Sequence, residues 1–478
     1  MSNETTGLPT VPRQRTTSPS WAAPDPVAQL ADRLDDFVSS AVHPDEIAAV
    51  LESDGLSDEQ IRERYGVHNS FALAEELYAR VPRRHPDPGE PPHDPWRAGL
   101  PACLLRGLVF ALPGFAYVLG ARLPAGPRGD LGLPVGTAAL LAGALFGWTW
   151  NQGLSHRAYA WLGLGDRAAA RRCLLLGAPV GALLGALTAL AVADGAAPSA
   201  VAFAAGQSCY LGASTTLLVL GRERALLAAL APMAAGALVT MVHPLPEPAG
   251  PTLLLGSLAA VILLGLREVS SAAKEPGPRS GRGGPRLTAS LPYALFGLGS
   301  GALVLYAALG DVLAGERHSA LAAPAAVALT LSMGPAEWLL YRFRSAGLAG
   351  LRSSGTPGTF RRTTVRTGAE CLAAYLCVLC GLGLAAAALW PDTPALTAVR
   401  LADLLLLGVV LWTGLLLQSF GAVLGTAAVC CTAALAQTLA LLTHATDPHG
   451  AALTVYGAAA AVQTAVVCTL LGRATAHR

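Results

Sequence analysis

The chain has 478 residues, of which 53% are apolar and only 13% are charged, and its mean hydropathy is +0.48. Because about 25% of the residues of a soluble protein are charged, this composition excludes an ordinary soluble fold and indicates a membrane protein. The formal net charge of +2 leaves no overall positive excess to hold a nucleic-acid backbone.

The chain begins with a polar segment and a short stretch of helical signals. Residues 1–27 are rich in Ser, Thr, Pro and Arg and lack the apolar stretch of a secretory signal, so we expect a disordered cytoplasmic N-terminus. Within residues 28–81, Ser57 and Gln60 form a capping box, and Asn69 precedes a further apolar-periodic run. The sequence predicts a small cytoplasmic domain of three or four short helices.

This small domain is acidic. Residues 28–81 contain 12 acidic and 4 basic residues, a balance of −8 that would repel phosphates. Residues 55–66 are similar to the first part of a helix-turn-helix, but a recognition helix needs basic residues facing the groove. We therefore expect no nucleic acid and interpret the domain as one that docks a cytoplasmic protein partner or regulates the rest of the chain. Residues 82–98, rich in Pro and Arg, form a semi-rigid linker.

From position 99 onward the chain is a series of apolar runs, each near the ~20 residues that a helix needs to cross a bilayer. The twelve predicted spans are 100–121, 132–152, 173–193, 198–220, 224–243, 251–267, 291–313, 319–341, 370–390, 401–419, 421–443 and 451–472. Placing the N-terminus in the cytoplasm assigns 19 of the 24 basic residues after position 100 to that side. We therefore expect a multi-pass protein of the inner (plasma) membrane, in contact with the lipid bilayer, with both termini in the cytoplasm.

The two halves of the membrane region echo each other. Gly147 and Arg157 reappear as Gly334 and Arg344 at a constant offset of 187. The sequence thus predicts an all-α polytopic fold with a first six-helix bundle over 99–268, a basic cytoplasmic loop over 269–290 and a second six-helix bundle over 291–478. An even number of helices in each copy gives both the same orientation, which suits transport by alternating access.

The loop after the second span has a recognisable pattern. A Gly-x-Gly-Asp stretch ends at Gly165 and Asp166 and is followed by Arg167, Arg171 and Arg172. This loop resembles that of the multidrug, oligosaccharidyl-lipid and polysaccharide (MOP) exporter superfamily, and the resemblance implies twelve helices in two bundles and a flippase-like or export function.

The second copy departs from the exporter pattern, since Arg352, Ser353 and Ser354 stand where Gly-Asp would be expected. The loop is also similar to that of major facilitator transporters, which stay as the alternative. The acidic N-terminal stretch resembles uncharacterised integral membrane proteins of high-GC actinobacteria.

Polar side chains inside apolar spans are the candidates for a substrate path. They are Asn151, Gln152, Gln207, Glu337, Gln418 and Gln437. Amides can hydrogen-bond a substrate without the cost of burying a charge, but they serve equally well to join neighbouring helices. Glu337 is a candidate coupling carboxylate or a structural group, with an imperfect (i, i+5) approach to Arg342. Asp403 is expected to pair locally with Arg400.

Signals for enzymes, metals and cofactors are missing. The chain has no His-Glu-x-x-His array and no phosphate loop, and its sole lysine, Lys274, lies in a Pro/Gly/Arg stretch. The nine cysteines all fall in apolar runs, including Cys377 and Cys380, and are interpreted as reduced packing residues. We expect no catalytic residue, no metal and no cofactor.

The sequence therefore favours a transporter or flippase-like protein that moves an amphipathic or lipid-linked substrate, such as a polysaccharide precursor. The alternative is a membrane scaffold that transports nothing and recruits cytoplasmic partners in envelope assembly or division. A membrane glycosyltransferase would need an acidic cluster at one membrane face, which the sequence does not contain.

Overall fold

The computed structural model describes residues 25–84, 99–120, 135–193, 195, 198–243, 246, 248–270, 284–313, 324–389, 397–443 and 447–471. Over these residues the regular structure is helical, with no strand. Most of the predicted disordered N-terminus, the linker and the central loop lie outside the described residues, as residues 1–24, 85–98 and 271–283.

Five helices, rather than three or four, form the N-terminal domain. They are α1 (Pro26–Arg33), α2 (Asp35–Ser40), α3 (Pro44–Ser53), α4 (Asp58–Tyr65) and α5 (Ser70–Arg80). The predicted capping box is confirmed: Ser57 Oγ accepts from the Gln60 backbone at 3.4 Å, and the Gln60 side chain accepts from the Ser57 backbone at 3.0 Å. The extra helix is explained by α1, which begins at Pro26 and is capped by Asp25, before the predicted start of the domain.

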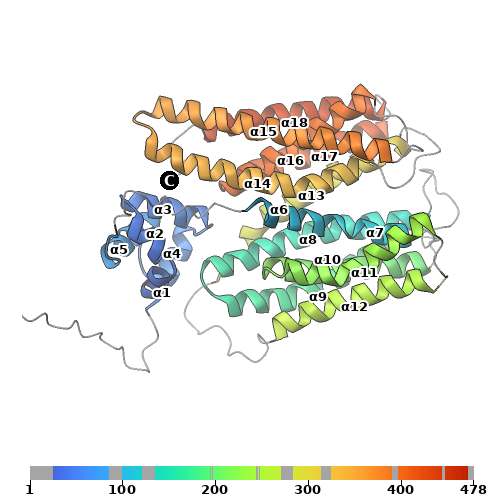
Figure 1. Ribbon diagram of the computed structural model, residues 1–478, viewed down its shortest axis with the longest axis horizontal. Helices are drawn as coiled ribbons and strands as arrows, with labels where there is room; N and C mark the ends of the chain where they lie inside the picture. The colour runs from blue at the N-terminus through green and yellow to red at the C-terminus, as the bar shows by residue number, and fades with distance from the viewer. Residues whose placement is uncertain are drawn as a thin grey trace, which may run out of the picture.

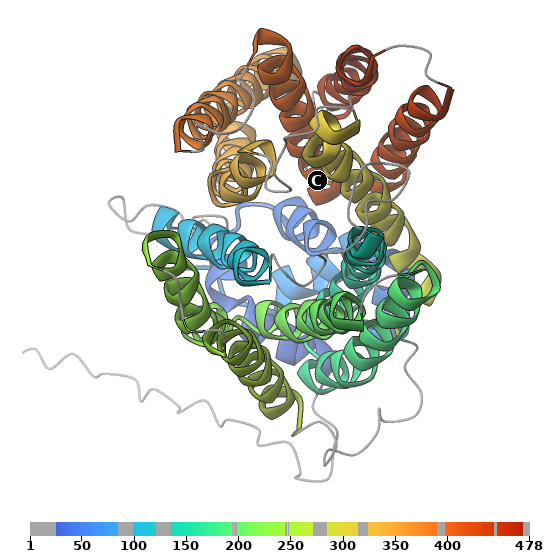
Figure 2. The ribbon, with the colours of Figure 1, turned by 90° about the vertical axis from the view of Figure 1, so that its right-hand side faces the viewer.

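The rest of the described chain forms two groups of long helices (Figures 1 and 2). The first bundle contains α6 (Leu100–Ala111), α7 (Gly114–Leu119), α8 (Val135–Gly163), α9 (Arg167–Ala191), α10 (Pro198–Val219), α11 (Glu223–Val242) and α12 (Ala249–Ser270). The second bundle follows the short turn η2 (Leu287–Ser290) and contains α13 (Leu291–Leu313), α14 (Pro324–Ser353), α15 (Pro357–Leu389), α16 (Ala398–Ser419), α17 (Val423–Thr443) and α18 (Pro448–Leu470). Since α6 and α7 make one rod broken at Leu112 and Pro113, each bundle has six rods.

Nine helices among the described residues are long and apolar enough to cross a membrane. They are α6 with α7, α9, α11, α12, η2 with α13, α15, α16, α17 and α18. The other three long helices, α8, α10 and α14, coincide with predicted spans but carry more polar residues, and each packs against at least two other long helices. The chain is an all-α, multi-pass membrane protein.

Three predicted boundaries differ by more than ten residues from the helix ends at the end of the bundles where the N-terminal domain sits, which we call the docked end (Figure 1). There α8 continues to Gly163, α14 continues to Ser353, and α15 begins at Pro357 rather than at position 370. Hydropathy marks the apolar part of a helix, whereas these helices continue as arginine-bearing turns beyond it. The opposite end of the bundles is called the far end.

The two bundles meet through two helix pairs, α6 with α14 and α8 with α13. In the first pair, a Cβ added to Gly107 would lie 2.7 Å from the backbone nitrogen of Gly334, closer than side-chain atoms can approach. Two glycines therefore bring the backbones of α6 and α14 into direct contact. In the second pair, the His156 ring stacks on Tyr293 with 3.7 Å between ring centroids.

Within the first bundle, α8 and α9 fit together as large residues against glycines. An added Cβ would collide with Leu154 at Gly177, with Trp150 at Gly181 and with Ser208 at Gly185, where it would also contact Phe146 at 3.5 Å. Phe146, Trp150 and Leu154 recur every four residues, so they form one ridge along α8 that fills the glycine groove of α9. Trp150 also donates from its indole nitrogen to the Gly177 carbonyl at 2.9 Å.

Candidate functional site

A network of three charged side chains joins the two bundles. Arg106 on α6 donates to Glu223 Oε1 from Nη2 at 2.8 Å and from Nε at 3.2 Å, and its Nη1 binds Glu337 on α14. The side chains of Glu223 and Glu337 are 16% and 22% exposed, so both carboxylates are largely removed from solvent. Their charges are tolerable because one guanidinium neutralises part of each. We call this group the ion network.

The close contact between Gly107 and Gly334 determines where the ion network lies. Arg106 is next to Gly107, and Glu337 lies one turn after Gly334, so the close approach of α6 and α14 brings the two charges within reach. The predicted approach of Glu337 to Arg342 is replaced by this long-range pair, while the Arg342 guanidinium lies 5.7 Å from the centre of the Trp338 ring. The partners are separated by 231 positions, and no local sequence signal connects them.

The candidate amides of the first bundle lie on α8 and α10. The Asn151 side chain donates to the Gly147 carbonyl at 2.7 Å, while its own Oδ1 is buried without a hydrogen-bond partner among the described residues. Gln207 Oε1 is also buried without a hydrogen-bond partner among the described residues. Gln152 packs against the Gly297 position of α13, at the contact between the bundles. Asn151 and Gln207 thus present buried acceptors within the first bundle, and Gln152 lies between the bundles.

The candidate amides of the second bundle behave differently from one another. Gln437 is 3% exposed and its Oε1 has no hydrogen-bond partner among the described residues, whereas Gln418 is half-buried close to the docked end of α16. Gln463 is fully buried, accepts from Thr413 at 2.7 Å and donates to Cys430 Sγ at 3.4 Å, so it joins three helices.

No hydrogen bond or ion pair among the described residues links any two of the six predicted path residues. The structure places them on five helices, with Asn151 and Gln152 as neighbours on α8, Gln207 on α10, Glu337 on α14, Gln418 on α16 and Gln437 on α17. They do not form one compact cluster. Their common feature is a position inside or between the bundles.

The predicted loop motif connects α8 to α9. Gly165 has φ +76°, a left-handed conformation that favours glycine, and Asp166 caps α9 by accepting from the Ala169 backbone at 2.8 Å. Arg167 is the first residue of α9, and Arg171 and Arg172 lie in its next turns. The motif therefore makes a tight turn and a helix cap at the docked end.

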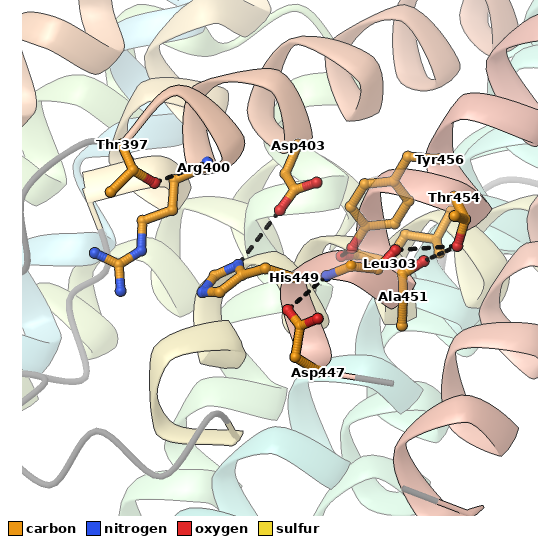
Figure 3. A network of polar contacts seen from close by, with 10 residues as sticks. Leu303, Thr397, Arg400, Asp403, Asp447, His449, Ala451, Thr454 and Tyr456 are labelled. Atoms are coloured by element: carbon orange, nitrogen blue, oxygen red, sulfur yellow. Dashed lines mark hydrogen bonds and ion pairs between the residues drawn. The ribbon is translucent and has the colours of Figure 1, made fainter. Parts of the chain in front are cut away.

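A second polar pair, which sequence reasoning did not connect, lies where α16 and α18 begin (Figure 3). Asp403 Oδ2 lies 3.3 Å from His449 Nδ1, and Asp403 Oδ1 is buried without a hydrogen-bond partner among the described residues. Nearby, the Tyr456 hydroxyl donates to the Leu303 carbonyl at 3.3 Å. The local pairing of Asp403 with Arg400 stays a prediction, and the histidine that Asp403 contacts is 46 positions away in sequence.

Groups suited to metals are sparse in the described part of the chain. No set of three His, Cys, Asp or Glu side chains gathers there as metal ligands would. All nine cysteines are free thiols, with Cys377 exposed and Cys380 half-buried on α15. The described residues thus offer hydrogen-bond acceptors and paired charges.

Comparison with known proteins gives results at the level of structure. No protein-family model matches this sequence, and no curated protein matches it. Solved structures similar to this chain include a MATE protein in complex with MaL6, with 13% identity, a TM-score of 0.41 and coverage of 79% of this chain and 98% of that one.

They also include a multidrug resistance MATE family transporter of the MOP superfamily in an outward-facing conformation, with 13% identity, a TM-score of 0.40 and coverage of 79% of this chain and 97% of that one.

Proposed function

We propose that this protein is a membrane transporter that moves an amphipathic or lipid-linked substrate by alternating access between its two bundles. The observation that carries the proposal is the way in which the bundles meet. The α6 half of the first rod packs against α14 of the second bundle, whereas the α7 half, beyond Pro113, packs against α11 and α12 of its own bundle. The bundles are therefore joined toward the docked end and part from each other along this rod toward the far end.

Separation of the two bundles at the docked end has to break the ion pair between Arg106 and Glu337 in the ion network. Arg106 and Glu223 belong to the first bundle and Glu337 belongs to the second. When the bundles separate, Arg106 keeps Glu223 as a partner, but Glu337 loses its only partner in the network. A carboxylate left in a poorly hydrated place binds a proton or gains water, so Glu337 is the group through which protons would couple to the movement.

The unsatisfied amides support a substrate with both polar and apolar parts. Asn151 Oδ1 and Gln207 Oε1 are acceptors without a hydrogen-bond partner among the described residues, and they lie on helices whose other side chains are largely Ala, Gly and Leu. A substrate hydroxyl could donate to such oxygens while its lipid tail meets the apolar surface. This pattern fits a lipid-linked sugar better than a simple ion.

We further propose that the docked end faces the cytoplasm of a plasma-membrane protein. Exposed arginines at Arg361, Arg362 and Arg366 occupy the first turns of α15 at that end. Basic residues next to membrane spans are retained on the cytoplasmic side.

A scaffold function remains the second candidate because of one observation. The second bundle has a continuous apolar core that includes Trp412 and Tyr456, and such a core leaves little room for a substrate within that bundle. The two candidates differ in what the first bundle and the interface do.

Reconstitution into liposomes with fluorescent lipid-linked sugar analogues tests the transporter. We expect movement above empty vesicles for the wild type, a loss of about tenfold or more for Glu337→Gln, and a smaller loss for Gln207→Ala. The matched control is Glu370→Gln, which removes an exposed carboxylate paired with Arg366 on α15 and should leave transport unchanged. No movement of any analogue by the wild type would favour the scaffold.

A further inference from the structure

The N-terminal domain packs on the docked end of the first bundle. Leu164, in the turn between α8 and α9, is 3% exposed and belongs to the apolar core of the N-terminal domain, with Trp161 packed beside it. Arg33 of α1 donates to the Gly163 carbonyl at 3.1 Å and lies 3.5 Å from the Leu162 carbonyl. A cation is thus placed at the C-terminal end of α8, where the helix dipole favours it.

The same domain also reaches the second bundle and the turn that leads into it. Glu59 on α4 forms an ion pair with Arg286, just before η2. Arg344 on α14 approaches the Ser53 carbonyl at 3.5 Å. The turn after α3 therefore lies between the end of α8 and α14.

Asp54 marks this junction of three parts. Its backbone oxygen would lie 3.3 Å from a Cβ added at Gly163 of the first bundle. Its carboxylate interacts with Arg33 of its own domain and with Arg344 of the second bundle. Partial desolvation at the junction raises the pKa of Asp54, although the residue keeps an exposed surface and the two guanidinium groups act to lower the pKa.

We propose that the N-terminal domain is a latch that holds the docked ends of the two bundles together, staying fixed to the first bundle and releasing the second when that end opens. This inference rests on the proposed alternating access. Because the domain contacts both bundles, separation of their docked ends has to break one of the two sets of contacts.

The chemistry of the contacts decides which set breaks. The contacts with the first bundle are an apolar side chain buried in the domain core and a guanidinium on helix-end carbonyls. Those with the second half are polar: a 3.5 Å approach of Arg344 to the Ser53 carbonyl, the charge interaction of Arg344 with Asp54, and an ion pair whose side chains are 72% and 45% exposed. Separating the first set would expose a buried apolar side chain to water, whereas the polar groups of the second set can exchange their partners for water, so the second set is the one that opens.

Hydrogen exchange followed by mass spectrometry on the full-length protein in lipid nanodiscs tests the latch without any substrate. We expect Glu59→Arg to speed amide exchange over residues 284–290 by about threefold or more, with residues 161–166 unchanged. The double variant Glu59→Arg/Arg286→Glu should restore slow exchange, because it re-forms the pair with the charges reversed. Glu63→Arg, on the exposed face of the same helix, should change neither segment.

Two results would overturn the latch. One is equal behaviour of Glu59→Arg and Glu63→Arg. The other is faster exchange of residues 161–166 together with residues 284–290 in Glu59→Arg, which would mean that the domain leaves both bundles as a whole.

Transport provides an independent measurement where the wild type moves an analogue. Release of the latch should then raise the transport rate of Glu59→Arg by about two- to fivefold over wild type and over Glu63→Arg. If no analogue is moved, the proposed function fails while the exchange experiment still decides whether the domain bridges the bundles.

Discussion

In the second bundle, buried side chains from all six helices form one continuous apolar cluster, whereas those of the first bundle divide among three separate clusters. Phe343, Trp412 and Tyr456, all below 2% exposure, fill the second core. In the first bundle, one cluster lies over α6, α7 and α10–α12, and two smaller ones lie among α8, α9 and α10, one of which also includes Val269 of α12.

The difference follows from the residues between the clusters. The first bundle has a glycine groove on α9 and unsatisfied amides at Asn151 and Gln207, whereas the second bundle, which also has an unsatisfied amide at Gln437, is filled by large apolar side chains. Glycines and amides allow close packing, but they contribute less apolar area than Leu or Phe. The second bundle is thus the stiffer body, and the first is the one suited to bend around a substrate.

The largest expected effect on the free energy of unfolding comes from creating a cavity in each core by the same leucine-to-alanine substitution. Leu407 in the second bundle and Leu226 in the first are both fully buried. We expect Leu407→Ala to lower the free energy of unfolding by about 4 kcal/mol and Leu226→Ala by about 3 kcal/mol, because a continuous core relaxes less around a cavity. Unfolding in bicelles measures both values. A larger loss for Leu226→Ala would reverse the comparison.

A smaller effect is expected at the glycines. An alanine at position 181 would place its Cβ 2.2 Å from the Trp150 ring, so Gly181→Ala should lower the free energy of unfolding by about 1–3 kcal/mol. Gly381, on α15, has no neighbour within 4 Å of an added Cβ, so Gly381→Ala should be neutral or stabilising by up to about 1 kcal/mol. Thermal unfolding of both variants in one detergent makes the comparison, and equal shifts would show that the groove is loose.

Replacing an amide by leucine should change the free energy of unfolding by amounts that differ between the two bundles by about 1 kcal/mol. Gln463→Leu breaks the bonds with Thr413 and Cys430 and should lower the free energy of unfolding by about 0.6–1.7 kcal/mol. Gln207→Leu removes an unsatisfied acceptor and should be neutral or stabilising, while transport falls. A destabilised Gln207→Leu protein would mean that Gln207 joins helices rather than meeting a substrate.

The smallest effect is one of pH on the contact between the N-terminal domain and the bundles. The folded pKa of Asp54 is raised above its ordinary value of 3.8, so the folded, docked state binds the proton more tightly than the unfolded state. Docking should therefore be strongest below pH 3.8 and weaken as pH rises through the raised pKa. Amide exchange of residues 53–57 should lose this dependence in Asp54→Asn, and an unchanged pH profile in that variant would assign the effect to another group.

Much of the architecture could be predicted because bilayer thickness and helical periodicity act locally. The twelve spans, the capping box at Ser57 and the arrangement of six rods followed by six needed only runs of apolar residues and punctuation. The ends of α14 and α15 could not be placed, because past the apolar core a helix is stabilised by arginine-bearing turns and tertiary contacts.

The sequence could identify individual residues of the candidate site but not the partners with which they interact. Glu337 and Gln207 stand out because polar groups in hydrocarbon are costly. Their partners do not: the pairs Arg106–Glu337 and Asp403–His449 join helices far apart in sequence. Such pairs depend on how the helices pack, and a single sequence contains no direct record of that packing.

The overlong helices have a mechanical consequence. At 1.5 Å per residue, the 30 residues of α14 and the 33 of α15 reach about 45 and 50 Å, while the hydrocarbon layer is about 30 Å thick. The turns beyond the hydrocarbon lengthen these helices, so a small tilt of α14 or α15 about its mid-bilayer part moves the end of the helix through a larger distance. Arg344 lies near the end of α14. A group at this position moves farther than the mid-bilayer part of the helix when the helix tilts, so contacts with Arg344 respond to small tilts.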